Sequence, residues 1–131
     1  MIVVDASVLA NVVADDGDDG SLARAALRGE EVAAPDLVDA ETVSVLRKRW
    51  LADDLTTRRF RRAIDDLADL AVTRYPTLPL MPRAFELRTN VTPYDAAYIG
   101  LAEALECPLL TGDARLAGAP GPRCEVRLLR S

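Results

Sequence analysis

Short apolar runs alternate along this chain with stretches of helical periodicity, and this alternation restricts the fold more than any other feature. Runs that are apolar at nearly every position suit strands buried on both faces of a sheet. Strands that alternate with helices are typical of a parallel sheet. The sequence therefore predicts an α/β fold with three layers and a mainly parallel central sheet. We expect its strands at residues 2–4, 32–34, 72–75, 109–111 and 125–129.

Helical periodicity fills most of the chain between these strands. Gly29 is expected to close the second helix, because glycine readily adopts the backbone conformation that follows a helix. Pro35 is expected to stop the second strand, and Asp36 to cap the helix after it. We expect helices at residues 7–14, 21–28, 37–50, 55–72, 82–88 and 93–106, with an acidic turn at 15–20.

Length and composition fit one compact domain over residues 1–131, since half of the residues are hydrophobic. No run approaches the roughly 18 apolar residues that a membrane span needs. Asp5 stands where a signal peptide would be apolar. We therefore expect a cytoplasmic protein without a membrane partner. Cys107 and Cys124 form no CxxC pair and are expected to be small, buried, apolar side chains.

The formal net charge of -5 argues against a protein that coats nucleic acid indiscriminately, because that task needs a basic surface. Positive charge is nevertheless concentrated at positions 47–49 and 58–62. One interpretation is ordinary surface pairing on a helix, since Arg61 with Asp65 and Arg62 with Asp66 are four residues apart. The other is contact with RNA phosphates, for which arginine is suited. The candidates for that contact are Arg47, Arg58, Arg59 and Arg62.

Four acids lie where an apolar run meets a helical stretch, in a chain that has no histidine. They are Asp5 in IVVDASV, Glu41 in DAETVSVLRKRW, Asp95 in TPYDAAYIGLAEAL and Asp113 in PLLTGDARL. Without imidazole, the usual general base and the commonest transition-metal ligand are both missing. Any chemistry must therefore come from carboxylates or from the ions that they hold. Carboxylate oxygens are hard ligands, which favours magnesium or manganese.

Two of these acids, Asp5 and Asp113, follow strands and should share the edge where parallel strands end, which is where ligands gather in such sheets. Asp95 and Glu41 lie in the first turns of helices that should point toward the same edge. The four converge only if the strand order brings their elements together.

Each acid also has a purely structural interpretation. Asp5 and Asp113 can be helix caps, and Asp95 can belong to a capping box that begins at Thr92. Glu41 has no cation three or four residues away, so it needs a positive partner from elsewhere in the chain.

The segments VVDASVLAN, AETVSVLRKR, NVTPYDAAYIGLAEAL and LLTGDARLA, in this order, resemble the PIN-domain ribonucleases of the VapC toxin type. The resemblance spans nearly the whole chain and implies a three-layer α/β/α PIN-like domain. It implies that the acids hold one or two Mg²⁺ or Mn²⁺ ions and hydrolyse RNA, and that two hydroxyls lie near the metal cluster. The acids carried over are Asp5, Glu41, Asp95 and Asp113, and the hydroxyls are those of Ser7 and Thr111.

In such a site, one ion lowers the pKa of a bound water and a second stabilises the leaving oxygen. We assign Asp5 and Asp95 to the tighter ion, and Glu41 and Asp113 to the water or the second ion. The resemblance further implies the toxin of a type II toxin-antitoxin system, with tRNA or rRNA as substrate, a VapB-type antitoxin and a homodimer. The rival interpretation is a catalytically silent PIN scaffold that binds RNA or a partner protein.

Overall fold

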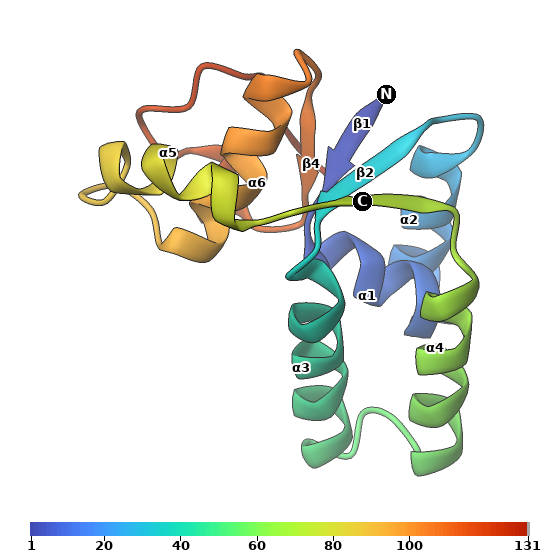
Figure 1. Cartoon of the computed structure of the whole chain (residues 1–131). Coiled ribbons are helices and arrows are strands. Elements are labelled where there is room, and N and C mark those ends of the chain that lie inside the picture. The colour runs from blue at the N-terminus through green and yellow to red at the C-terminus, as the bar shows by residue number, and fades with distance from the viewer. Residues whose placement is uncertain (131) are drawn as a thin grey trace.

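In a computed structural model of the chain, which describes residues 1–130, five strands form one parallel sheet in the order β3-β2-β1-β4-β5 (Figure 1). The central strand β1 is fully buried, with Val3 and Val4 both 0% exposed. This confirms the expected α/β fold with a parallel sheet. The strands are β1 (Ile2–Val4), β2 (Val32–Pro35), β3 (Val72–Tyr75), β4 (Leu109–Thr111) and β5 (Val126–Leu128).

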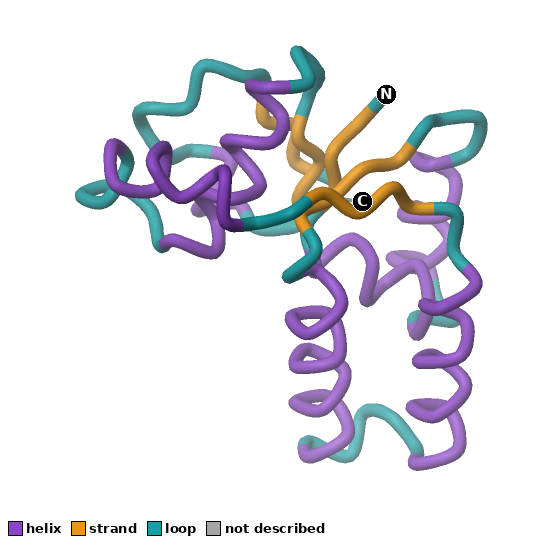
Figure 2. Tube along the Cα trace, viewed as in Figure 1, coloured by secondary structure: helices purple, strands orange, loops and turns teal. Residues whose placement is uncertain are grey.

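Helices gather in two groups on opposite sides of the strands (Figure 2). The helix α1 packs against α2, α3 and α4 in one group, while α6 packs against α5 and the central strands in the other. Within residues 1–130, none of the helices is both long enough and apolar enough to cross a bilayer. The helices are α1 (Ala6–Ala14), α2 (Asp18–Leu27), α3 (Val38–Leu51), α4 (Thr57–Asp69), α5 (Met81–Glu86), α6 (Pro93–Ala104) and α7 (Ala114–Ala117), with a 3-10 turn at Leu78–Leu80.

The loop between α1 and α2 is shorter than expected, because α2 begins at Asp18. The Asp15 carboxylate accepts hydrogen bonds from the amides of Gly17 and Gly20, each 2.9 Å long, and so folds the acidic segment into the helix start. At the other end of α2, Gly29 has a φ of +78°, which confirms its role in closing the helix.

The prediction that Asp36 caps α3 is wrong. Leu37 occupies the cap position, and no side chain caps the helix there. The Asp36 carboxylate instead accepts hydrogen bonds from the hydroxyl of Thr77, at 2.6 Å, and from its amide, at 3.2 Å. Asp36 therefore bonds to a residue 41 positions away in sequence and not to the nearby amides at the start of α3.

Each predicted helix differs from its expected bounds by a few residues at one or both ends. The helix α4 starts after a cap by Thr56 and ends at Asp69, so it leaves residues 70 and 71 to enter β3. The 3-10 turn before α5 was not expected, and α6 ends at Ala104 rather than at residue 106. Helix ends are where local pattern is least informative, since the last turn is held by few hydrogen bonds.

Candidate active site

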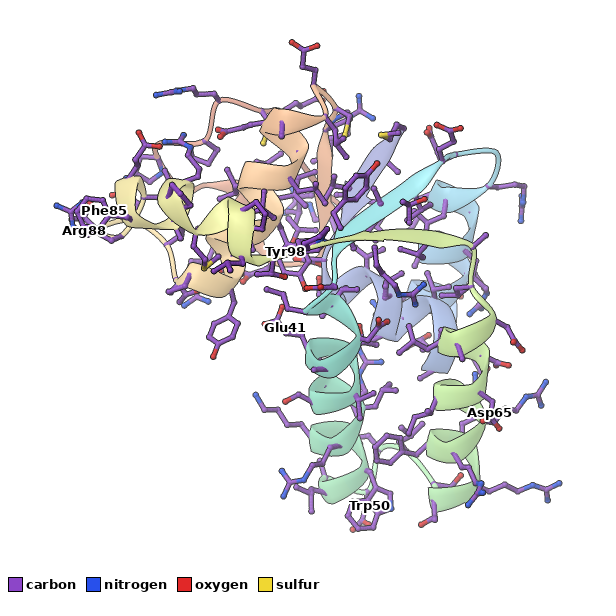
Figure 3. The ribbon with its side chains drawn as sticks, in the orientation of Figure 1. Glu41, Trp50, Asp65, Phe85, Arg88 and Tyr98 are labelled. Carbon is purple, nitrogen blue, oxygen red and sulfur yellow. The ribbon has the colours of Figure 1, made fainter. Side chains whose placement is uncertain are left out.

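The strand order places Asp5 and Asp113 next to each other. The strands β1 and β4 are neighbours, with Val4 opposite Leu110, and each acid follows the end of its strand. The helix α6 packs on both strands and carries Asp95 in its first turn. Glu41 lies in the first turns of α3, directly after the end of β2 (Figure 3). The strand order therefore leads the elements that carry the four acids to the carboxyl edge of the sheet.

Asp5 is held by donors on both of its carboxylate oxygens. Its side chain is buried, at 6% exposure. Oδ1 accepts from the Ser7 hydroxyl at 2.5 Å and from the Val8 amide at 3.3 Å, and Oδ2 accepts from the Thr111 hydroxyl. Burial nevertheless raises the pKa of Asp5 above its ordinary value, against the effect of these hydrogen bonds.

Two hydroxyls connect Asp5 to the loop that follows β4. Ser7 accepts from the Gly112 amide at 2.9 Å, and Thr111 accepts from the Asp113 amide at 3.0 Å. A side chain at position 112 would place its Cβ 3.2 Å from the Ser7 oxygen, so glycine permits this close approach. Ser7 and Thr111 thus lie in the acid site, where they orient Asp5.

Glu41 has a partner that the sequence did not reveal. The phenol of Tyr98, which is 1% exposed, donates to Glu41 Oε1 at 2.6 Å (Figure 3). Burial raises the pKa of Glu41, and the carboxylates of Asp95 and Asp5 raise it further, while the tyrosine hydrogen bond opposes them. Burial and the nearby carboxylate also raise the pKa of Tyr98, so it remains a protonated donor. The expected positive partner is therefore replaced by a neutral phenol.

Asp95 and Asp113 complete the site. Burial raises the pKa of Asp95, followed by the effects of the Asp5 and Asp113 carboxylates. The Asp95 amide donates to the Thr92 hydroxyl at 3.2 Å, as the capping interpretation predicted. Asp113 Oδ1 accepts from the Arg115 amide at 2.9 Å, and Oδ2 lies 3.5 Å from the Arg115 guanidinium. Asp5 and Asp113 therefore both cap helices.

A carboxylate that caps a helix can still bind a metal ion, since it has about four acceptor positions and capping uses only some of them. Within residues 1–130, no three Cys, Asp or Glu side chains are placed to hold a metal ion as they stand. Glu41 points to Tyr98 and Asp113 points to Arg115, and both side chains rotate about single bonds. The carboxylate oxygens fit a hard divalent cation, which prefers oxygen ligands. Such an ion would also relieve the repulsion between crowded, partly desolvated carboxylates.

The candidate RNA-binding arginines lie elsewhere. Arg58 and Arg59 begin α4, at the end where the rings of Trp50 and Phe60 are 6.5 Å apart, far along α3 from Glu41 (Figure 3). Arg59 pairs with Asp16 at 3.0 Å. Of the two predicted surface pairs, Arg62 pairs with Asp66 at 4.0 Å, whereas Arg61 and Asp65 form no ion pair among residues 1–130. Arg47 is exposed on α3. Contact of these arginines with RNA remains a prediction.

The raised pKa values set the direction of a pH effect on stability. A carboxyl whose pKa is raised by folding stabilises the protein below its ordinary pKa, and this stability is lost as pH rises through the folded value. Without metal, we expect Asp5, Glu41 and Asp95 to make the protein less stable at pH 7 than at about pH 4, near the ordinary pKa of a carboxyl. Urea unfolding in EDTA at both pH values measures this change. The Asp5→Asn variant should show a smaller change than the wild type, and an equal change in both proteins would contradict the expectation.

These features define an α/β protein with an acidic site at the carboxyl edge of a parallel sheet. Residues 2–122 match the PIN domain family, and the chain belongs to that family. Ribonuclease VapC1 of Mycobacterium tuberculosis is 44% identical over 129 residues, which cover 98% of this chain and 97% of the relative.

Two solved structures share the fold. One is VapC20 of Mycobacterium tuberculosis, described as a sarcin-ricin loop cleaving toxin, with a TM-score of 0.70 at 18% identity, over 91% of this chain and 96% of that one. The other is VapBC2 from Rickettsia felis, bound to a DNA fragment from their promoter, with a TM-score of 0.68 at 14% identity, over 99% of this chain and 100% of that one.

Proposed function

We propose that this protein is a Mg²⁺- or Mn²⁺-dependent endoribonuclease that acts as the toxin of a type II toxin-antitoxin system. One observation carries the proposal: four acids from four separate elements lie at one edge of the sheet. Burial raises the pKa of Asp5, Glu41 and Asp95, and neighbouring carboxylates raise the pKa of Glu41 and Asp95 further. The identity of 44% with a ribonuclease over nearly the full length supports the same activity.

The proposed chemistry follows from the charge of the substrate. A phosphodiester is anionic, so four carboxylates alone would repel it. One or two divalent ions held by Asp5, Glu41, Asp95 and Asp113 would supply charge neutralisation and an activated water. The chain's own contribution is to fix the acids: Ser7 and Thr111 hold Asp5, and Tyr98 holds Glu41.

The same proposal includes partners. We propose an RNA substrate, tRNA or rRNA, a VapB-type antitoxin and a homodimer. The fold shared with VapBC2 and the identity with VapC1 support the antitoxin. An arginine or lysine from the antitoxin would inhibit by pairing with the acids, because it would compete with metal for the same oxygens.

Incubation of purified protein with a structured RNA tests the activity. We expect cleavage with Mg²⁺ or Mn²⁺ and none with EDTA. The Asp95→Asn variant controls for a contaminating nuclease and should leave the RNA intact. If the wild type binds RNA but cleaves none with either ion, the catalytically silent scaffold is favoured.

Metal binding is also tested by thermal stability, without reference to activity. A ligand that binds only the folded state stabilises it by mass action, by about 2.7 kcal/mol at a concentration of 100 times its Kd. We therefore expect millimolar Mn²⁺ to raise the Tm of the wild type by several degrees. The Asp5→Asn variant should respond much less. Identical melting curves with Mn²⁺ and with EDTA in the wild type would contradict a metal site.

A further inference from the structure

A pocket of about 370 Å³ opens beside Asp95, between the end of α5, the start of α6 and α7. Two of its lining residues, Arg88 and Arg115, are positively charged, although the whole chain carries a formal net charge of -5. We call it the arginine pocket. It is lined by Arg88, Thr89, Asn90, Val91, Thr92, Pro93, Asp95, Arg115, Leu116 and Ala119.

Arg115 joins the arginine pocket to the acid site. Its side chain is 84% exposed, and its guanidinium lies 3.5 Å from Asp113 Oδ2. The second acid, Asp95, lines the same pocket as Arg115. A group bound at Arg115 would therefore lie directly beside the proposed metal ligands.

Arg88 supplies a second positive charge, and this one is held in place. Its guanidinium carbon lies 4.1 Å from the centre of the Phe85 ring, and Nη1 donates to the Phe85 carbonyl at 2.8 Å (Figure 3). Stacking on an aromatic ring restrains an arginine while leaving other N–H groups free to donate. Among residues 1–130, Arg88 forms no ion pair with a carboxylate.

We propose that the arginine pocket binds the nucleotide that flanks the scissile phosphate, as part of an unpaired segment of the RNA substrate. This inference rests on the proposed function and deepens it. Arg88 and Arg115 bind the adjacent phosphates, and the base enters between the apolar lining and the polar groups of Thr89 and Asn90. Ordinary ligand pockets measure about 300 to 1,000 Å³, and proteins read RNA sequence mainly from unpaired bases. The pocket thus selects single-stranded over fully paired RNA.

The location also distinguishes these arginines from those at the start of α4. Arg115 contacts one of the acids directly, whereas Arg59 pairs with Asp16 at the far end of the α3 and α4 helices. A phosphate bound at Arg58 or Arg59 would lie away from the acids, so it would add affinity without positioning the cleaved bond.

The test compares RNA binding and cleavage by the Arg88→Ala/Arg115→Ala double variant with those of the wild type. Binding of a fluorescent single-stranded RNA is measured by anisotropy in EDTA, where no metal-dependent cleavage is expected. We expect the affinity for RNA to fall at least about tenfold. The slope of log affinity against log salt concentration should become shallower by roughly the amount that one phosphate contact contributes for each arginine removed. The Arg88→Lys/Arg115→Lys variant should recover most of the salt dependence. Circular dichroism checks that each variant is folded.

The matched control is Arg28→Ala/Arg61→Ala, which removes two exposed arginines outside the pocket. It should bind RNA as the wild type does. Unchanged binding in the pocket variant, or an equal loss in the control, would overturn the pocket proposal. A wild type that cleaves no RNA with either ion would instead contradict the proposed function, while the binding comparison would still decide the pocket.

Discussion

The Asp5→Asn variant is expected to lose metal-dependent RNA cleavage by a factor on the order of 10³ while remaining folded. Asp5 is the most buried of the four acids, and its negative charge raises the pKa of both Glu41 and Asp95. Removing that charge weakens the attraction of the whole site for a divalent ion. Initial cleavage rates at saturating Mn²⁺, measured for both proteins, give the ratio.

The fold should survive this change because asparagine is as good a helix cap as aspartate. Its carbonyl can accept from the Ser7 hydroxyl and the Val8 amide, and its amide group can donate to Thr111. Loss of the buried negative charge also removes repulsion, so stability in EDTA should equal or exceed that of the wild type. Glu41→Gln gives a second variant at the same site, with Tyr98 still able to donate to the amide oxygen. Full cleavage by both variants would exclude these acids from catalysis.

The positions of Asp5 and Asp113 were predictable because each acid lies within a few residues after a short apolar run. Such a run is recognisable locally, and the edge at which parallel strands end is a property of the fold class. The order of the strands was not predictable, because it depends on packing between segments that are distant in sequence. The adjacency of β1 and β4, which brings these two acids together, came only from the structure.

Hydrogen bonds between side chains that are far apart in sequence could not be predicted from the sequence pattern. Tyr98 bonds to Glu41 across 57 positions and Thr77 bonds to Asp36 across 41. Tyr98 had one weak signal, since its polar hydroxyl lies in the otherwise apolar run AAYIGL. Arg88 and Arg115 had no such signal in the sequence. Nearly all of the chain's cations are arginines, so residue type alone does not distinguish the few that lie near the site.

One such long-range contact joins α5, α6 and the segment before β5 through Arg83 and Glu103. The Arg83 guanidinium donates to both oxygens of Glu103, from Nε at 2.7 Å and from Nη2 at 3.0 Å. Their side chains are only 15% and 16% exposed. The same groups hold the following loop, since Arg83 also donates to the Gly121 carbonyl and Glu103 accepts from the Arg123 amide.

We expect Glu103→Gln to lower the free energy of unfolding by about 2 to 3 kcal/mol, because it leaves the largely buried Arg83 with only the exposed carboxylate of Glu86, 3.8 Å away, as counter-charge. Urea unfolding at pH 7 measures the loss. The matched control is Glu125→Gln, whose pair with Arg127 is 60% and 51% exposed. Exposed pairs contribute little, so this variant should change stability by less than about 1 kcal/mol. Equal losses in the two variants would show that the Arg83 pair has no special role.

The effect of Glu103→Gln should also depend on pH. Burial acts to raise the pKa of Glu103, but the hydrogen bonds from Arg83 and from the Arg123 amide outweigh it, so that folding lowers the pKa. A carboxyl with a lowered pKa stabilises the fold above its ordinary value of about 4.3, and the stability is lost as pH falls through the folded value. The difference between the wild type and Glu103→Gln should therefore be largest near neutral pH and shrink in acid. This direction is opposite to that expected for Asp5, so the two contributions can be separated in one pH series.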